Sequence, residues 1–138
     1  MKSQRRRQRA TTLIGLALAI GLGGCKAVPL APGAEKVIVS RQAAPEGCKF
    51  VGAVVGEQGG MVSGQLTSNK NLAQGALNDI RNKALQLGAN YVSLESVSAG
   101  TTSRGSFYEG TGSVSAAQTD VTKTGNAYHC HPEAIGLK

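Results

Sequence analysis

The stretch that decides the fold is NLAQGALNDIRNKALQL, residues 71–87. Within it, alanines and large apolar residues recur at three- and four-residue spacing: Leu72, Ala76, Ile80, Ala84 and Leu87. This spacing lines them up as one apolar stripe of an α-helix, which has to be buried against another element. Asn71 can cap the start, with Gln74 in capping-box position, and Gly88 supplies the left-handed residue that commonly ends a helix. The stretch therefore predicts one amphipathic helix over residues 71–87.

Four short runs around this helix have the composition of β-strands. They are KVIVSR (36–41), CKFVGAVVG (48–56), NYVSLESVS (90–98) and DVTKTGNAYHC (120–130). The second run carries apolar residues on both faces, which is typical of a central, largely buried strand. In the third run, alternation puts Val92 and Leu94 on one face and Val97 on the other. The order β-β-α-β-β predicts an α+β fold: a small antiparallel or mixed sheet of about four strands, with the helix on one face.

The first 24 residues precede this domain and have the layout of a secretory signal. Lys2 and four arginines make a basic start, and residues 11–22 are then almost wholly apolar. The apolar run is shorter than the roughly 20 residues that a membrane span needs. It ends Leu22-Gly23-Gly24-Cys25, which resembles the bacterial lipobox. We therefore expect cleavage before Cys25 and attachment of lipid to its thiol. The alternatives are a non-lipidated signal peptide and an uncleaved anchor.

The expected anchor also predicts a location and a domain layout. Two or three acyl chains give stable attachment to a membrane, whereas one is marginal. Lys26 stands where an aspartate resembles an inner-membrane retention signal. We therefore expect the inner leaflet of the outer membrane, facing the periplasm, reached through the lipoprotein processing and sorting machinery. Residues 25–34 are expected to form the lipidated cysteine and a short Pro-containing tether, and nine extended residues reach roughly 25–30 Å. Residues 35–138 then form one domain, in which the Gly-, Ser- and Thr-rich residues 99–118 are expected to be a mobile loop or a loose hairpin.

Most of the net positive charge lies in the signal. The chain has 15 Lys and Arg against 8 Asp and Glu, a net charge of +7. Five of the basic residues fall within residues 1–24, so ten basic residues face eight acidic ones after cleavage, which leaves only +2. Nucleic-acid binding needs a basic patch on the folded domain. Because the sequence after residue 25 has no basic cluster, we expect no nucleic-acid partner.

After lipidation of Cys25 two cysteines remain, Cys48 and Cys130. An even number of cysteines in the oxidising periplasm suggests a disulfide, and here only one pairing exists. The bond would close a loop of about 83 residues, for which the chain-entropy model gives roughly 4–5 kcal/mol of stability. The alternative is a redox-active pair, although catalytic pairs are more often close in sequence, as in C-x-x-C.

His129 and His131, the two histidines of the chain, flank Cys130. On a strand they point away from the cysteine, and they would converge on one ion only with a bend at Pro132. No further cysteine and no acidic cluster completes a tetrahedral site. We therefore expect no metal site here, with metal handling as the alternative. Because no nucleophile elbow, phosphate loop or carboxylate pair stands out, we also expect no enzymatic activity and no cofactor.

Together these motifs resemble an uncharacterised family of bacterial lipoproteins, the domain-of-unknown-function 4156 family. The matching segments, spread over about residues 30–132, are Pro32-Gly-Ala-Glu-Lys-Val37, Gly47-Cys-Lys-Phe50, Asn71 to Lys83, Leu87-Gly-Ala-Asn90 and Ala127-Tyr-His-Cys130. More distantly, the plan resembles the envelope-stress sensor lipoproteins of the Rcs pathway. Those resemble two-disulfide domains on a long Pro-rich linker, whereas this chain offers one disulfide and a short tether.

The anchor, the small disulfide-bonded domain and the lack of a catalytic constellation favour a non-catalytic envelope lipoprotein. Such a protein would bind another envelope protein or a cell-wall component, in assembly or in stress sensing. Bulky residues in polar loops often make contacts, so Met61 and Phe107-Tyr108 are the candidate binding residues. The alternatives are an accessory subunit of a larger envelope or secretion machine, and a metal-handling protein that uses His129 and His131.

Overall fold

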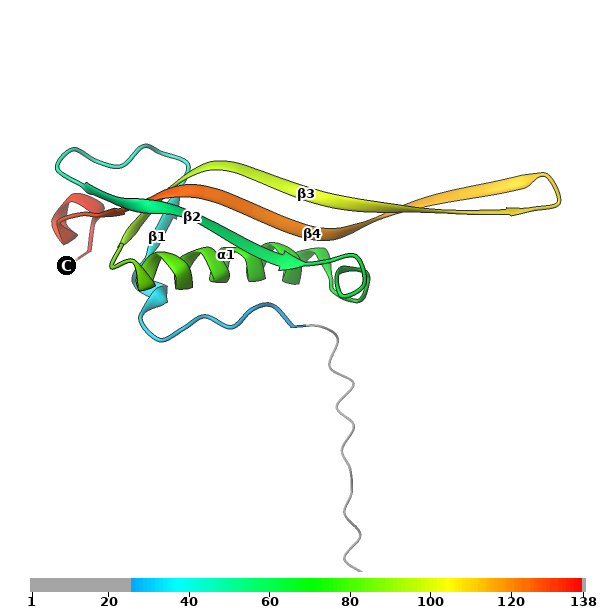
Figure 1. The fold of residues 1–138 in the computed structure, drawn as a ribbon, viewed down its shortest axis with the longest axis horizontal. Helices are drawn as coiled ribbons and strands as arrows, with labels where there is room; N and C mark the ends of the chain where they lie inside the picture. The colour runs from blue at the N-terminus through cyan, green and yellow to red at the C-terminus, as the bar shows by residue number, and fades with distance from the viewer. Residues whose placement is uncertain (1–25, 138) are drawn as a thin grey trace, which may run out of the picture.

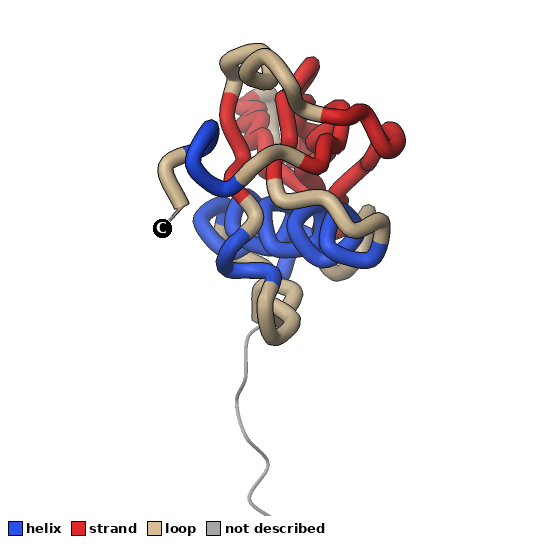
Figure 2. Tube along the Cα trace, turned by 90° about the vertical axis from the view of Figure 1, so that its left-hand side faces the viewer, coloured by secondary structure: helices blue, strands red, loops and turns tan. Residues whose placement is uncertain are grey.

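A computed structural model of the chain describes residues 26–137 (Figure 1). Its main elements are β1 (Ile38–Ser40), β2 (Lys49–Gly59), α1 (Asn69–Gln86), β3 (Tyr91–Tyr108) and β4 (Thr111–His129). Short 3-10 turns occupy Ala34–Lys36, Gly64–Leu66 and Pro132–Ile135. The strands form one four-stranded sheet in the order β1-β3-β4-β2, and α1 covers one face of it (Figure 2). The predicted α+β fold is confirmed, whereas the expected signal segment and Cys25 lie outside the described residues.

The sheet is mixed because β1 runs parallel to β3, with Ile38 opposite Tyr91, while β2 and β3 both run antiparallel to β4. Strand β2 lies at the edge of the sheet, so its predicted central position was wrong. Its two apolar faces have different environments, because α1 covers only one of them. On the other face Phe50 stays exposed and meets the Tyr128 ring edge-on, with ring centroids 5.7 Å apart. An aromatic pair therefore stands where the sequence suggested a second buried face.

Helix α1 begins two residues before the predicted start. Ser68 has extended backbone geometry and its Oγ accepts a hydrogen bond from the Asn71 amide at 3.2 Å, so Ser68 is the N-cap. Gln74, six residues after Ser68, is not in capping-box position, and its amide donates to Asn78 Oδ1 at 2.9 Å. The C-terminal end follows the prediction, since Gly88 has a φ of 74° directly after the helix cap.

The core lies between α1 and the sheet in two adjoining clusters. The larger one consists of Val37, Val54, Ile80, Ala84, Ala89, Val92 and Ala127, and the smaller one of Leu72, Ala76 and Val121. The helix approaches β2 most closely at Gly56. A Cβ built on that glycine would lie 2.4 Å from the Ala76 carbonyl oxygen. The predicted apolar stripe of the helix is thus the surface that packs on the sheet, except at Leu87, which is 46% exposed.

The predicted disulfide joins Cys48 to Cys130, whose Cα atoms are 4.2 Å apart. Cys130 is fully buried, and its backbone is held from the opposite side by Asn90. The Cys130 amide donates to Asn90 Oδ1, and Asn90 Nδ2 donates to the Cys130 carbonyl, both at 2.8 Å. The Asn90 backbone also bonds to Tyr128 and Ile38. One asparagine therefore ties the start of β3 to the ends of two other strands.

Residues 99–118, expected as a mobile loop or a loose hairpin, form a continuous hairpin of β3 and β4. The register carries on to Tyr108 opposite Thr111, so only Glu109 and Gly110 form the turn. Both have positive φ, 46° and 80°, as a type I′ turn requires. Figure 1 shows the hairpin extending far beyond β2 and α1. We call residues 101–118 the ribbon.

Candidate functional site

The segment that follows the expected lipid attachment point is bound to the outer side of α1. The Asn78 side-chain amide donates to the Val28 carbonyl at 2.7 Å. Asn82 bonds in both directions, from its Nδ2 to the Pro29 carbonyl and from the Ala31 amide to its Oδ1. We call residues 28–34 the strap. Because α1 holds the strap, the full 25–30 Å reach expected of a free tether does not apply, and the described chain begins against the body of the domain (Figure 1).

A glycine in the middle of α1 helps to hold the strap. Gln58 reaches from β2 across the helix at Gly75, where a Cβ would lie 2.1 Å from Gln58 Oε1. That oxygen accepts a hydrogen bond from the Val28 amide at 2.8 Å. A glycine inside a helix costs about 1 kcal/mol relative to alanine. Here it leaves room for the side chain that links the sheet edge to the strap.

Three bulky apolar residues stand exposed on the turn between β2 and α1. Met61, Val62 and Leu66 expose 78%, 76% and 70% of their surface. The turn is nevertheless well bonded, since the Gly60 amide donates to Thr119 O at 3.0 Å and Thr67 Oγ1 donates to Ser63 O at 2.8 Å. We call residues 60–67 the apolar turn. Its backbone is fixed by hydrogen bonds, and its three apolar side chains are exposed to solvent.

The ribbon leaves strand edges open on both sides. Strand β1 pairs only with residues 91–93 of β3, and β2 pairs only with residues 120–129 of β4. Residues 101–118 therefore bond to each other and to no other strand of the described chain. Tyr108 and Val114, near its tip, are 78% and 70% exposed. The side chain of Phe107 lies outside what the structure describes.

The outer edge of β2, by contrast, is capped by helix side chains. The Glu57 amide donates to Asp79 Oδ2 at 2.9 Å, and Lys83 Nζ donates to the Val55 carbonyl at 2.8 Å. Asp79 and Lys83 also pair with each other at 2.8 Å. Unpaired edges invite pairing with other chains, and natural proteins usually block them. Within residues 26–137, helix side chains block the outer edge of β2 in this way, whereas the two edges of the ribbon are not blocked.

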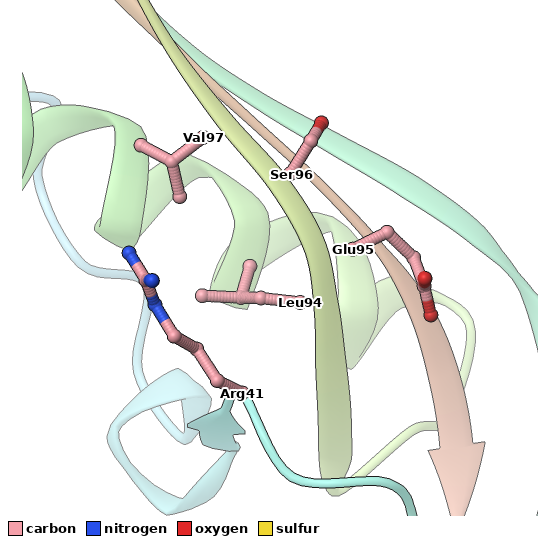
Figure 3. A pocket seen from close by; sticks show the side chains of 5 residues that line it. All are labelled: Arg41, Leu94, Glu95, Ser96 and Val97. Carbon is pink, nitrogen blue, oxygen red and sulfur yellow. The ribbon is translucent and has the colours of Figure 1, made fainter.

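A small hollow lies on the helix side of the sheet, beside the end of β1 (Figure 3). Arg41, Leu94, Glu95, Ser96 and Val97 line its volume of about 170 Å³. Val97 was predicted on the opposite face from Leu94, but a register shift between Leu94 and Ser96 turns both toward Arg41. Ligand pockets usually have about 300–1,000 Å³. The hollow is therefore too small for an ordinary organic ligand.

Arg41 and Glu95 line this hollow, and a second cation, Lys123, lies on the neighbouring strand. Lys123 lies opposite Val97 in the sheet, and the described residues hold no carboxylate within ion-pairing distance of Lys123 or Arg41. Partial burial lowers the pKa of Lys123 below its usual 10.5, and the positive charge of Arg41 lowers it further. The charged form of Lys123 is thus disfavoured by folding.

Replacing Lys123 by methionine should slightly raise the melting temperature at pH 7. The lowered pKa means that the unfolded chain holds the Lys123 proton more tightly than the folded one. The charged lysine therefore destabilises the folded state, and this effect is complete at pH values below the pKa that Lys123 has in the folded protein. It fades as the pH rises toward 10.5, and the gain from Lys123→Met should fade with it. Because Lys123 is only partly buried, we expect less than about 1 kcal/mol. Melting curves at pH 7 and pH 10, with the exposed Lys70→Met as control, measure this; equal shifts in both variants would contradict it.

The two histidines lie at the disulfide corner. His129 Nδ1 lies 2.9 Å from the Gly88 carbonyl oxygen, and both His129 and His131 are exposed. Residues 26–137 contain no group of three His, Cys, Asp or Glu side chains placed to hold a metal ion. The same residues include no helix that is both long and apolar enough to cross a bilayer.

These features define a single-helix α+β domain with one disulfide, a bound N-terminal strap and a projecting ribbon. The chain belongs to the family described as a domain of unknown function, DUF4156, whose model matches residues 28–130. The resemblance predicted from the sequence motifs is therefore confirmed for this family, while the one to the Rcs lipoproteins stays a prediction. No curated protein and no solved structure matches the chain.

The candidate binding residues named from the sequence fall at two separate places. Met61 is on the apolar turn and Tyr108 at the ribbon tip, both strongly exposed. Sequence reasoning missed Val62 and Leu66, which accompany Met61. The signal for them was present, since both are bulky apolar residues in the same Gly- and Ser-rich segment. It missed the hollow, because a register shift in β3 brings Val97 to the same side as Leu94, and the chain after β1 brings Arg41 beside them.

Proposed function

We propose that this protein is a lipid-anchored envelope protein without catalytic activity, which binds another envelope protein through its ribbon. The lipobox supports attachment through Cys25, and Lys26 supports the inner leaflet of the outer membrane. The observation that carries the binding proposal is the pair of open edges on residues 101–118. At about 3.4 Å per residue, eight residues on each strand project roughly 27 Å from the body of the sheet.

The mode of binding is the addition of a partner strand to the ribbon. A two-stranded hairpin alone in water is marginally stable, so a third strand gives it the pairing that it lacks. Strand addition takes its affinity from main-chain hydrogen bonds and its specificity from alternate side chains. The ribbon suits this, because apart from its tip its side chains are mostly small and leave the backbone accessible. The capped edge of β2 directs such pairing away from the body.

Crosslinking in intact cells tests the proposal. A photoreactive amino acid at Tyr108 or Val114 should capture the same envelope protein, identified by mass spectrometry. The same group at Leu87, which is 46% exposed and lies at the C-terminal end of α1, should not capture it. Equal capture at Leu87, or none at the ribbon, would refute the proposal. Capture of a second copy of this chain alone would also refute it, because the ribbon would then be a dimer contact.

A shortened ribbon separates binding from folding. Thr102 lies opposite Ala117, so replacing residues 103–116 with Asn-Gly closes the hairpin by a two-residue turn in the same register. Because the removed residues are largely exposed and belong to neither core cluster, the melting temperature should change little. Crosslinks from Thr102 to the partner should disappear. A shortened protein that still captures the partner would place the contact elsewhere.

A further inference from the structure

We infer that the apolar turn is a membrane-docking surface, on which Met61, Val62 and Leu66 enter the lipid interface beside the anchor. This inference rests on the proposed lipid attachment at Cys25 and goes beyond it. A lipid alone would leave the domain free to tilt and rotate over the bilayer. A second, protein-made contact would give it one fixed orientation.

The first step is the place where the anchored chain joins the domain. Val28, three residues after Cys25, is held by Gln58 Oε1 and by Asn78 Nδ2. Gln58 lies three residues before Met61, and both belong to the end of β2 and the turn that follows. The strap therefore prevents the domain from moving away on a long tether. It brings the end of β2 and the apolar turn toward the membrane that holds the lipid.

The second step is the exposure of the turn. Its three apolar side chains are each at least 70% exposed, although hydrogen bonds fix the backbone that carries them. A helical or turn surface with exposed apolar residues typically buries them in the boundary between headgroups and acyl chains. Contiguous exposed apolar patches often mark a contact with a protein, a ligand or a membrane. Of these, the one that the anchor brings close is the membrane.

The third step is charge. From Gln58 to Asn78 the sequence contains no acidic residue, and its one charged side chain is the exposed Lys70, directly after the turn. Lys26, at the start of the described chain, adds a second cation. Basic residues near a membrane are attracted by anionic lipids, whereas acidic ones would be repelled. Glu57 and Asp120, which lies opposite Gly59, stand beside the turn on the sheet, so charge adds only weakly to the apolar contact.

The absence of tryptophan from the chain permits a direct test. In the full, lipidated protein, Val62→Trp places one indole on the turn and Val114→Trp places one on the ribbon, at sites of similar exposure. Each variant is incorporated into vesicles of phosphatidylethanolamine and phosphatidylglycerol. We expect the Val62→Trp emission to shift to shorter wavelength and to lose most of its intensity when the acyl chains are brominated. The Val114→Trp emission should do neither.

Flotation of the same vesicles separates the two proposals. If the Val62→Trp protein floats with the vesicles but its indole stays as accessible to aqueous iodide as the control indole, docking is wrong and the anchor stands. If the protein does not float, and mass spectrometry finds no lipid on Cys25, both are wrong. Loss of the emission shift on Met61→Ser and Leu66→Ser, in a protein that still floats and keeps its melting temperature, would support docking by the whole turn.

Discussion

Breaking the bond between Cys48 and Cys130 should lower the free energy of unfolding by roughly 4–5 kcal/mol in the chain-entropy model. The residues are 82 positions apart, so the bond restricts most of the unfolded domain. The described domain, residues 26–137, has a modest core, and this loss would be a large part of its total stability. Cys130 is fully buried, so alanine is a better replacement than serine, whose hydroxyl would add the loss of an unpaired polar group. Urea unfolding of the Cys48→Ala/Cys130→Ala variant measures the effect.

The control for this prediction is the response to a reducing agent. Reduction should shift the unfolding midpoint of the protein with both cysteines and leave that of the Cys48→Ala/Cys130→Ala variant unchanged. Replacing Cys25 by serine in all samples removes the third thiol that otherwise competes for pairing. A midpoint that is the same with and without reductant would show that the bond contributes little, and that strand pairing and the Asn90 hydrogen bonds hold these ends together.

The elements with a strong local pattern were predictable from the sequence, and their neighbours in space were not. The apolar stripe from Leu72 to Ala84 predicted the helix and the face that it buries, because helical periodicity is a local property. The two cysteines outside the lipobox predicted the disulfide by their number alone. The start of α1 was missed by two residues, because Ser68 and Asn71 are both good caps and only the backbone conformation decides between them.

The position of β2 in the sheet was not predictable because apolar content does not specify what covers it. Alternation placed Phe50 and Val55 on opposite faces, both expected to be buried, but a register shift between Phe50 and Gly52 puts both on the uncovered face of an edge strand. The ribbon was ambiguous for a related reason. Its strands consist mostly of Ser, Thr, Gly and Ala, which give no clear alternation, and a Glu-Gly pair is a weaker turn signal than Asn-Gly.

The candidate sites depend mostly on contacts between distant parts of the chain. The sequence could suggest Met61 and Tyr108, because bulky residues stand out in polar surroundings. It could not show that Asn78 and Asn82 bind the strap, because polar residues on a helix usually face solvent. Gly75 carried the nearest hint. A glycine inside an otherwise good helix suggests close approach of another group, and here that group is the Gln58 side chain.

Replacing Gly56 by valine should destabilise the domain by roughly 3 kcal/mol or more, because the interface between β2 and α1 has no room for a side chain. A Cβ at this position would lie 2.4 Å from the Ala76 carbonyl oxygen and 2.5 Å from Ile80 Cβ. Both are parts of α1 that rotamer changes cannot move. The helix would have to separate from β2, which would also expose Val54 and loosen the main core cluster. Thermal unfolding followed by circular dichroism measures the loss.

The matched control is Ala53→Val, three residues earlier on the same strand. Ala53 is exposed on the face that α1 does not cover, and valine is favoured over alanine in strands. We therefore expect Ala53→Val to leave the melting temperature unchanged or to raise it slightly. If Gly56→Val unfolds at the same temperature as Ala53→Val, then α1 does not pack against the β2 backbone as described. The hydrogen bond that Asp79 accepts from β2 and the one that Lys83 donates to it depend on that same packing, so that result would contradict them as well.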